Sequence, residues 1–506
     1  MAARNTSKAF AVYLDDPRRA TKRITTNIRL VSKGHLLRNF SSTGGNRYGG
    51  GPAPSLLPTG LGLSRKISPE VMQTISALPE VSAVLDDGKS RPPKLSMAEQ
   101  ISSLKRAEQI FQQFGGSTAA SGGNNDHLDA VRMMLADRLS HVGKFDETAI
   151  CIESLLGIVN GREASGTDDK TFELNVALAK VQFYGGGGLM SAAERAVDIA
   201  TEVDDVSMAA LRQGVAMNAL ALVKLARMAY ADESSTPEKL ADEADECREM
   251  LSMATRVLNK STNEVDAILT RSLALAEAAS SSNQGIAEML YHTLRAKATG
   301  YENVAPAENA LICWNAGFNR LEGRGNIPIA DILRSRLHSN IAMALLGGAI
   351  HDGNLKIGEE DLKNASENAI NSLRLLDGIV EQSSSSGDDT REALRTLSGR
   401  SLRLVADCYA RGGSAVTAEG LYQSAIDLLD EDKHVNHGGP QALIERREVY
   451  NSYATLYSNW EKRSRESNEM KKKANQLEEQ IAGCWRNKPS TYGGLWLFSI
   501  SDLTCL

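Results

Sequence analysis

The sequence offers few residues whose types and spacing are suited to chemistry. The one close histidine pair is His434 and His437, which stand two residues apart in a predicted loop. Two such imidazoles can supply two ligands to a metal ion, but a zinc site needs at least a third protein ligand. No third ligand stands nearby, and no H-E-x-x-H motif occurs. We therefore predict a solvated loop here.

Two glycine-rich segments have part of the pattern of a phosphate-binding loop. Gly353 and Gly358 have the spacing of a P-loop, but Glu359 and Glu360 follow where a lysine and a hydroxyl residue are required. Their negative charge would repel phosphate. The run Gly185–Gly188 falls between two predicted helices and is interpreted as a hairpin turn. Nucleotide binding is not supported by either segment.

The cysteines and the paired carboxylates do not form a reactive set either. The cysteines lie far apart without a C-x-x-C pair, which predicts buried or incidental thiols in a reducing compartment. Cys408 is expected as a small apolar filler, and the pairs Asp204-Asp205 and Glu359-Glu360 as solvated charges at helix ends. We thus predict no catalytic, cofactor-binding or metal-binding residue, and no enzyme activity. The six cysteines are Cys151, Cys247, Cys313, Cys408, Cys484 and Cys505.

The rest of the chain has the pattern of stacked helices. It has only 13 prolines and 5% aromatic residues, with abundant Ala, Leu, Met and Glu, which favours helix over sheet. From about Ser96 onward apolar residues recur at i, i+3, i+4 and i+7, and no stretch alternates at period two. No window approaches 18 unbroken apolar residues, so no transmembrane helix is expected. We predict roughly fifteen helices, broken at 115–125, 160–169, 185–188, 232–237, 280–284, 323–328, 353–358, 383–389 and 434–440.

One predicted helix pair, Leu402–Asp430, has a recognisable spacing of small and large apolar residues. Its first helix matches W-x2-L-G-x2-Y, and its second helix matches A-x3-F. Small residues let two antiparallel helices approach, and the tyrosines fill the space between them. The segment therefore resembles a tetratricopeptide repeat. The matching residues are Leu402, Val405, Ala406 and Tyr409, followed by Ala418 and Tyr422.

Weaker copies of this pattern occur elsewhere. One aligns at Leu135, Ala136 and Leu139, the next places Phe183 at the slot of Leu139, and another begins at Tyr450. Their intervals of 44 and 48 residues exceed the roughly 34 residues of a standard repeat, so the resemblance is to the degenerate, long-helix form of the family. The region 206–380 matches only by helical pairing. A charged helix, Ser464–Ile481, suits the solvating cap of such an array.

The resemblance implies an all-α protein, an α-solenoid of stacked helical hairpins whose concave groove holds a protein or peptide. Some members of the family grip the C-terminal carboxylate of a chaperone with a Lys and an Asn one helical turn apart. The matching slots here are Arg403 and Asp407 in the clearest unit, and Met133 and Asp137 in another. An aspartate would repel a carboxylate, so we expect no chaperone-tail clamp.

The first 45 residues have a different composition from the body. They contain nine Lys and Arg against Asp15 and Asp16, a net of +7, whereas the whole chain has a net charge of −6. The segment is rich in Arg, Ser and Thr, and the sequence around Phe40 resembles a mitochondrial processing site. We predict a transit-peptide-like leader (1–45), a flexible linker (46–95), a helical repeat domain (96–485) and a C-terminal tail (486–506). A disordered basic tail is the alternative to the leader.

Two functions from different classes follow from these features. The first is a non-enzymatic interaction scaffold in mitochondria, in the matrix or at the inner membrane, that acts in complex assembly or organisation; a plastid or the cytoplasm is the alternative address. The second is an organelle RNA-binding repeat protein of the pentatricopeptide kind, which requires a regular period of about 35 residues and a basic groove. The irregular intervals and the acidic body make nucleic acid the less favoured partner.

Overall fold

The protein is helical throughout the part that the computed structural model describes, and no strand occurs in that part. The described residues are 61, 63–87, 95–115, 123–141, 144–161, 169–185, 190–202, 206–229, 236–260, 267–298, 308–322, 328–346, 357–382, 388–430, 440–460 and 462–484. The sequence-based prediction of an all-α fold is confirmed. No described helix is long and apolar enough to cross a membrane.

A short 3-10 helix, η2 (Leu63–Lys66), precedes 17 α-helices in these ranges. The first part of the array is α3 (Pro69–Ile75), α4 (Pro79–Asp87), α5 (Met97–Gly115), α6 (Gly123–His141), α7 (Phe145–Gly161), α8 (Asp169–Gly185), α9 (Ser191–Thr201), α10 (Val206–Ala229) and α11 (Pro237–Lys260). The second part is α12 (Ala267–Ala298), α13 (Glu308–Leu321), α14 (Pro328–Leu345), α15 (Glu359–Gln382), α16 (Asp388–Arg411), α17 (Ala415–Asp430), α18 (Pro440–Ser458) and α19 (Ser464–Cys484).

Local sequence signals set several of the helix starts. α5 begins with a reciprocal capping box, in which the backbone N–H of Ser96 donates to Glu99 Oε2 at 2.7 Å and the backbone N–H of Glu99 donates to Ser96 Oγ at 3.3 Å. The hydrogen bonds from Ser96 lower the pKa of Glu99. Proline stands at the first position of α11, α14 and α18, where its missing N–H has no intrahelical partner to lose.

The predicted hairpin Leu402–Asp430 lies in α16 and α17. Ala406 and Ala418 are both fully buried, as expected for residues at a close helix contact. Gly413 turns the chain between the two helices at φ 81°, which a residue with a Cβ rarely adopts. The following N–H of Ser414 donates to the carbonyl oxygen of Tyr409 at 2.9 Å and so caps the end of α16.

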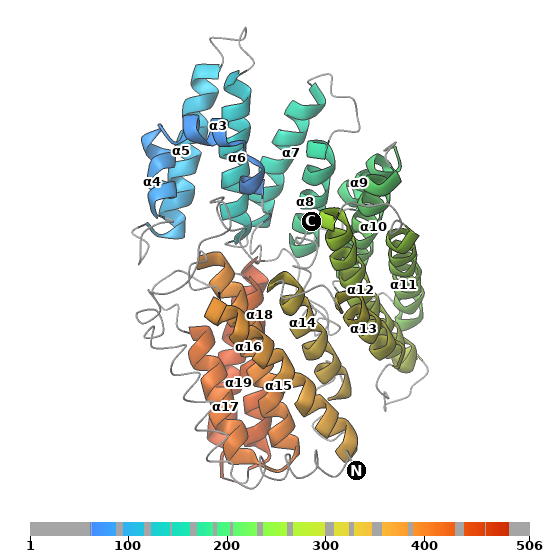
Figure 1. Cartoon of the computed structure of the whole chain (residues 1–506). Helices are drawn as coiled ribbons and strands as arrows, with labels where there is room; N and C mark the ends of the chain where they lie inside the picture. Colours follow the sequence, from blue (N-terminus) through green and yellow to red (C-terminus); the bar gives the residue numbers. More distant parts are fainter. Residues whose placement is uncertain are drawn as a thin grey trace, which may run out of the picture.

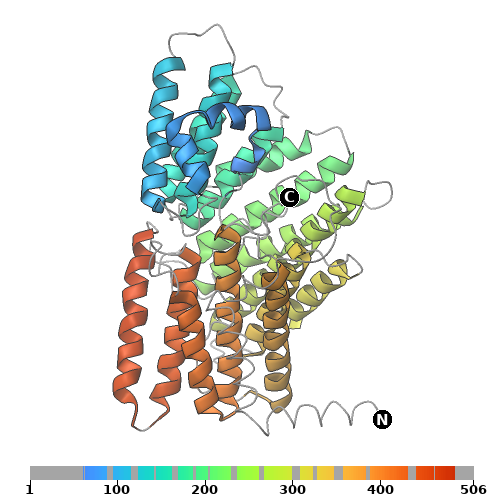
Figure 2. The ribbon, with the colours of Figure 1, turned by 60° about the vertical axis from the view of Figure 1, so that its left-hand side comes forward.

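The helices stack in order as antiparallel neighbours (Figures 1 and 2). Each helix from α4 onward packs on the next one in the chain, and each even-numbered helix from α8 to α18 also contacts the next even-numbered helix. The even-numbered helices thus form one continuous row, and the odd-numbered helices lie against it. This is the packing of a two-layered, solenoid-like array.

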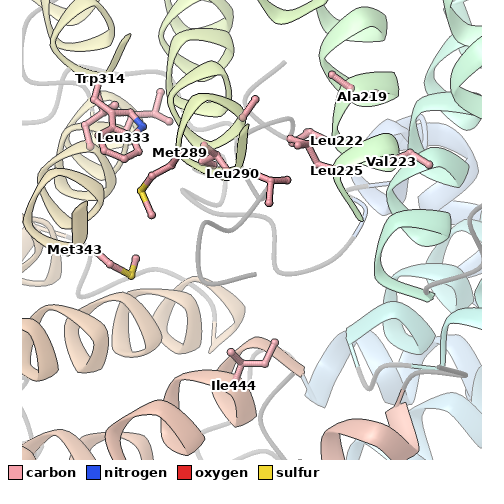
Figure 3. Packing of buried hydrophobic residues seen from close by; sticks show 14 of the residues in the cluster. Ala219, Leu222, Val223, Leu225, Met289, Leu290, Trp314, Leu333, Met343 and Ile444 are labelled. Carbon is pink, nitrogen blue, oxygen red and sulfur yellow. The ribbon is translucent and has the colours of Figure 1, made fainter. Parts of the chain in front are cut away.

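Because of this packing, side chains of the two rows of helices differ in how deeply they are buried. The even-numbered helices have neighbours on several sides, and α12, α14 and α16 carry long stretches of buried residues, whereas α11, α15 and α19 alternate buried and exposed positions. Figure 3 shows Leu222 of α10, Met289 of α12 and Met343 of α14 directed toward a common central region. All three are at most 6% exposed. Together with their neighbours they belong to the largest hydrophobic cluster, which extends from η2 to α19.

The predicted break at 280–284 is wrong, because α12 runs unbroken through it. The small polar residues there are buried, and two of them take part in hydrogen bonds to neighbouring helices. The side-chain amide of Asn283 donates to Asn218 Oδ1 of α10 at 2.9 Å, and Trp314 Nε1 of α13 donates to the carbonyl oxygen of Ser282 at 3.0 Å. Gly285 leaves the space that the Trp314 ring fills. The polar residues at 280–284 therefore mark contacts between helices, and they do not form a turn.

The segment predicted as a linker also contains helices. η2, α3 and α4 lie within residues 63–87, and Ile75, Val81 and Val84 are buried in a second hydrophobic cluster with α5 and α6. Ser68 caps α3, its Oγ accepting from the N–H of Val71 at 3.3 Å. These helices are too short for periodicity to identify, which explains why the sequence pattern indicates helix only from Ser96.

Candidate binding pocket

The cysteines whose side chains the structure describes are not poised as nucleophiles. Cys151, Cys247, Cys313 and Cys408 are free thiols. Burial raises the pKa of Cys151 to about 11 and the pKa of Cys247 to about 12, and it raises that of Cys408 as well. Because the thiolate is the reactive form, these thiols are unreactive at neutral pH.

The other candidate residues for metal, phosphate or acid–base chemistry do not come together in a site, or they lie outside the described residues. His434, His437, Gly353 and the pair Asp204-Asp205 are outside them. Glu359 and Glu360 are exposed in the first turn of α15, where acidic side chains suit the positive end of the helix dipole. Among the described residues, no group of three or more His, Cys, Asp or Glu side chains is placed to hold a metal ion.

Arg403 and Asp407, the first pair of positions that match the chaperone-tail clamp, lie inside the array. Arg403 is only 2% exposed, whereas its charge and its place in a groove-facing clamp position would predict an exposed side chain. Its Nη1 pairs with Asp407 Oδ2 at 3.1 Å, and the hydroxyl of Tyr422 donates to Asp407 Oδ1 at 2.5 Å. Burial and the adjacent Asp407 raise the pKa of Tyr422, which keeps the phenol protonated. These residues join α16 to α17 and present no clamp to a ligand.

Further buried charges join α16 to the neighbouring even-numbered helices. Arg400 Nη2 donates to Asn340 Oδ1 of α14 at 2.8 Å. On α18, Arg447 pairs with Glu448 and with Glu478 of α19, both at 2.6 Å. Burial raises the pKa of Glu445, and the positive charges of Arg400 and Arg403 oppose the rise. The arginines here are internal links of the array and do not form a basic surface.

Met133 and Asp137, the second pair of positions that match the chaperone-tail clamp, lie beside a cavity. Asp137 of α6 is half-buried and accepts hydrogen bonds from the backbone N–H groups of Leu63 at 3.1 Å and Ser64 at 2.8 Å, and from the Ser64 hydroxyl. Burial raises the pKa of the Asp137 carboxyl, and the hydrogen bonds from Ser64 and Leu63 oppose the rise. The carboxylate thereby fixes η2 against α6. Met133, one helical turn earlier, lines the cavity.

This cavity has a volume of about 430 Å³ and lies among η2, α3, α6 and α8. Its volume falls within the range of about 300–1,000 Å³ typical of ligand pockets. Most of its wall is apolar, so it suits an aliphatic or aromatic group. The apolar residues are Leu63, Ile67, Val71, Ala130, Met133 and Leu174.

The polar part of the lining is acidic. Asp126, Asp129 and Glu173 contribute three carboxylates, whereas Lys170 contributes the only cation in this lining. Lys170 Nζ pairs with Asp129 Oδ2 at 3.0 Å, and the Asp129 side chain is 2% exposed. Asp126 is exposed and Glu173 is half-buried, so their charges lie at the solvent side of the pocket. The pocket therefore combines an apolar wall with charged side chains at its solvent side.

Sequence reasoning did not identify this pocket. Met133 and Asp137 were considered only as clamp slots, and the wall formed by Leu63 and Ile67 lies in the segment predicted as a linker. The signal that remains in the sequence is Ser68 followed by Pro69, a cap and a first helical residue. That pair marks the start of α3 but not its place in the wall of the pocket.

Comparison with known proteins does not assign the chain to a family. No protein-family model matches the chain, and no curated protein is detectably similar to it in sequence. The class that the structure itself defines is a two-layered array of antiparallel helices, and the likeness to tetratricopeptide repeats stays a prediction.

Proposed function

We propose that this protein is a non-enzymatic scaffold for protein–protein interaction, imported into mitochondria, that acts in the assembly or organisation of a complex. The observation that carries the proposal is the ordered stack from α4 to α19, in which each helix packs on its sequence neighbour and the even-numbered helices from α8 to α18 form one continuous row. Such arrays offer an extended surface to a partner. The basic, acid-poor leader supports the proposed import.

The partner in this proposal is a protein or peptide held along the array, and the buried charges support this choice over RNA. Three arginines of α16 and α18 have partners inside the array: Arg400 bonds to Asn340 of α14, Arg447 pairs with Glu478 of α19, and Arg403 pairs with Asp407 of its own helix. A surface for RNA needs cations that face the phosphates. The RNA alternative is therefore an outcome of the test below.

The test of the scaffold combines affinity purification with cross-linking in isolated mitochondria. We expect one or a few proteins to be recovered with cross-links that map to a contiguous set of helices. Recovery of RNA with cross-links to the same helices would instead favour the pentatricopeptide-like alternative. Cross-links scattered over the whole surface would contradict a specific binding face.

Import is tested separately with a fluorescent protein fused to the C-terminus of the full chain. We expect a mitochondrial signal, and a diffuse signal from a matched fusion that lacks residues 1–40. An identical distribution of the two fusions would contradict import. A plastid signal would support import but place the protein in the other organelle.

A further inference from the structure

We propose that segment 489–501 of this same chain binds the inner side of the even-numbered row, the side toward which side chains of α10, α14 and α18 point (Figure 3). The segment contains no charged residue. It has five large apolar side chains within six positions, and burial of such side chains is favourable because it removes them from water. They are Leu495, Trp496, Leu497, Phe498 and Ile500.

The burial of α16 is the first reason for this assignment. In a two-layered array, the inner row has one side that the helices of the two rows leave open. Residues 396–406 of α16 are nevertheless all buried, and eleven residues make about three turns, so they point in every direction around the helix axis. The described helices that pack extensively on α16 are α14, α15, α17 and α18, and all four belong to the two rows. We infer that a further segment of the chain covers the inner side of α16.

The apolar character of the inner side is the second reason. Leu222 of α10, Met343 of α14 and Ile444 of α18 are directed toward a common central region (Figure 3), and all three are at most 6% exposed. They belong to one hydrophobic cluster, although α18 does not pack extensively on α10 or on α14 among the described helices. An apolar segment between these helices accounts for the burial of their side chains.

The end of α19 is the third reason, because it places segment 489–501 close to the inner side. α18 and α19 are antiparallel neighbours (Figure 1), and Arg447 Nη1 of α18 pairs with Glu478 Oε2 of α19 at 2.6 Å. Cys484 ends α19 six residues after Glu478, so it lies opposite the first two turns of α18. Those turns include Ile444, one of the three inner apolar residues.

The linker is long enough for the contact, and the neighbouring segments are less suited to it. Residues 485–494 join Cys484 to Leu495 and allow a span of up to about 36 Å. A short tether gives an effective concentration on the order of millimolar, so even a weak contact forms in the intact chain. The segments before α16 and α18 are polar: 383–387 consists of four Ser and a Gly, and 431–439 begins with Glu, Asp and Lys.

Binding of segment 489–501 controls access to the inner side of the row. A protein partner that binds there has to displace the segment first, so the segment acts as an internal competitor. This consequence rests on the proposed scaffold function. The contact itself does not, and the experiments below measure it in the purified chain alone, so a failed search for partners leaves their outcome unchanged.

Photo-cross-linking tests the contact directly. The full chain carries p-benzoylphenylalanine in place of Phe498 and is irradiated at high dilution, and the linked residues are mapped by mass spectrometry. We expect links within one molecule to α10, α14, α16 or α18. The control carries the same group in place of Arg465, whose side chain is 90% exposed on α19, and should not link to Met343 or Ile444. Links from position 498 to a second copy, to other segments only, or to no residue would overturn the proposal.

Competition tests whether the tethered segment occupies the inner side in the intact chain. The probe is a labelled synthetic peptide of residues 486–503, and its fluorescence anisotropy is measured as full-length chains are titrated in. A chain with Trp496→Ser, Leu497→Ser and Phe498→Ser lacks an effective internal competitor, so we expect it to bind the probe at least about tenfold more tightly than wild type. A probe with the same three replacements should bind this chain at least about tenfold more weakly. Equal binding of the first probe by the two chains, or no binding by either, would contradict the proposal.

Two matched chains locate the contact on the array, and both carry the three Ser replacements. In one, Met343→Thr and Ile444→Thr reduce the apolar surface of the inner side; in the other, Met253→Thr and Ile312→Thr make the same changes at exposed positions of α11 and α13. The inner changes should weaken probe binding at least about fivefold, and the outer changes less than about twofold. Equal weakening would refute the inner side as the binding surface. Circular dichroism of each chain confirms that its helix content is unchanged.

Discussion

Replacing Gly285 by Ala should locally loosen the middle of the array. An ideal Cβ at this position would lie 2.3 Å from Trp314 Nε1 and 2.6 Å from Trp314 Cε2. Atoms that are not bonded do not approach this closely, so the indole ring has to move. Trp314 is fully buried between α12 and α14, and its ring has no solvent-exposed end that can give way.

The cost has two parts. Overpacking a closed core costs about 1–3 kcal/mol. Movement of the ring also breaks the hydrogen bond from Nε1 to the carbonyl oxygen of Ser282, now 3.0 Å long, which contributes about 1 kcal/mol. The intrinsic preference of helices for Ala over Gly offsets at most about 1 kcal/mol. We expect a net loss of about 1–3 kcal/mol for Gly285→Ala.

Hydrogen exchange by mass spectrometry is the suitable assay, because long helical arrays need not unfold in one step. A loss of 1–3 kcal/mol corresponds to exchange roughly 5- to 160-fold faster in peptides of α12 and α13. The matched control is Gly157→Ala on α7, where nothing lies within 4 Å of an added Cβ. That change should slow exchange, since Ala favours a helix by about 0.5–1 kcal/mol. Unchanged or slower exchange for Gly285→Ala would refute the packing described for Trp314.

Three further changes test other parts of the array. Ala418→Leu should overpack the hairpin of α16 and α17 by about 1–3 kcal/mol, and hydrogen exchange should accelerate there before it does in distant helices; uniform acceleration would contradict a nearest-neighbour stack. Arg403→Ala should cost about 3 kcal/mol in the local stability that hydrogen exchange reports for α16 and α17, because it leaves the Asp407 carboxylate without its ion pair; a cost below about 0.5 kcal/mol would mean that the pair is not formed. Ser96→Ala should cost about 1 kcal/mol through loss of the α5 cap. The folded pKa of Glu99 is lowered below 4.5, so the stability that its carboxylate adds to the start of α5 is complete above that pH and is lost as the pH falls through the folded pKa. At such low pH, hydrogen exchange at the start of α5 in the wild type should approach that of Ser96→Ala. A persistent difference would exclude the Glu99 contact.

Helices and their ends were predictable where the pattern is long and the break contains Gly or Pro. The break before Pro328 separates α13 from α14, and the break before Pro440 separates α17 from α18, as predicted. The break at 280–284 failed because Ser and Asn favour turns only when their side chains bond to the local backbone. Asn283 bonds to Asn218 on another helix, a contact that no local pattern contains.

The pocket could not be predicted from the sequence, for a related reason. Its wall joins residues near 63–71 to α6 and α8, and η2 is held on α6 by one carboxylate, Asp137, that accepts from the backbone of Leu63 and Ser64. In the sequence, Asp137 is one of many acids on a helix. Only its hydrogen bonds with Leu63 and Ser64 show that it holds η2 in place. The same holds for Arg403, whose charge predicts exposure although Asp407 pairs with it inside the array.

The tetratricopeptide-like spacing has a physical origin that does not require common descent. Two antiparallel helices pack closely only if small residues lie at the contact, and Ala406, Ala418 and Ala425 are all fully buried there. The larger Tyr422 then fills the adjoining space and stacks on Tyr453 of α18, with ring centroids 5.3 Å apart. That contact extends the packing from one hairpin to the next. Any stack of helical hairpins has to satisfy both requirements, so the spacing indicates the architecture even though no family model matches the chain.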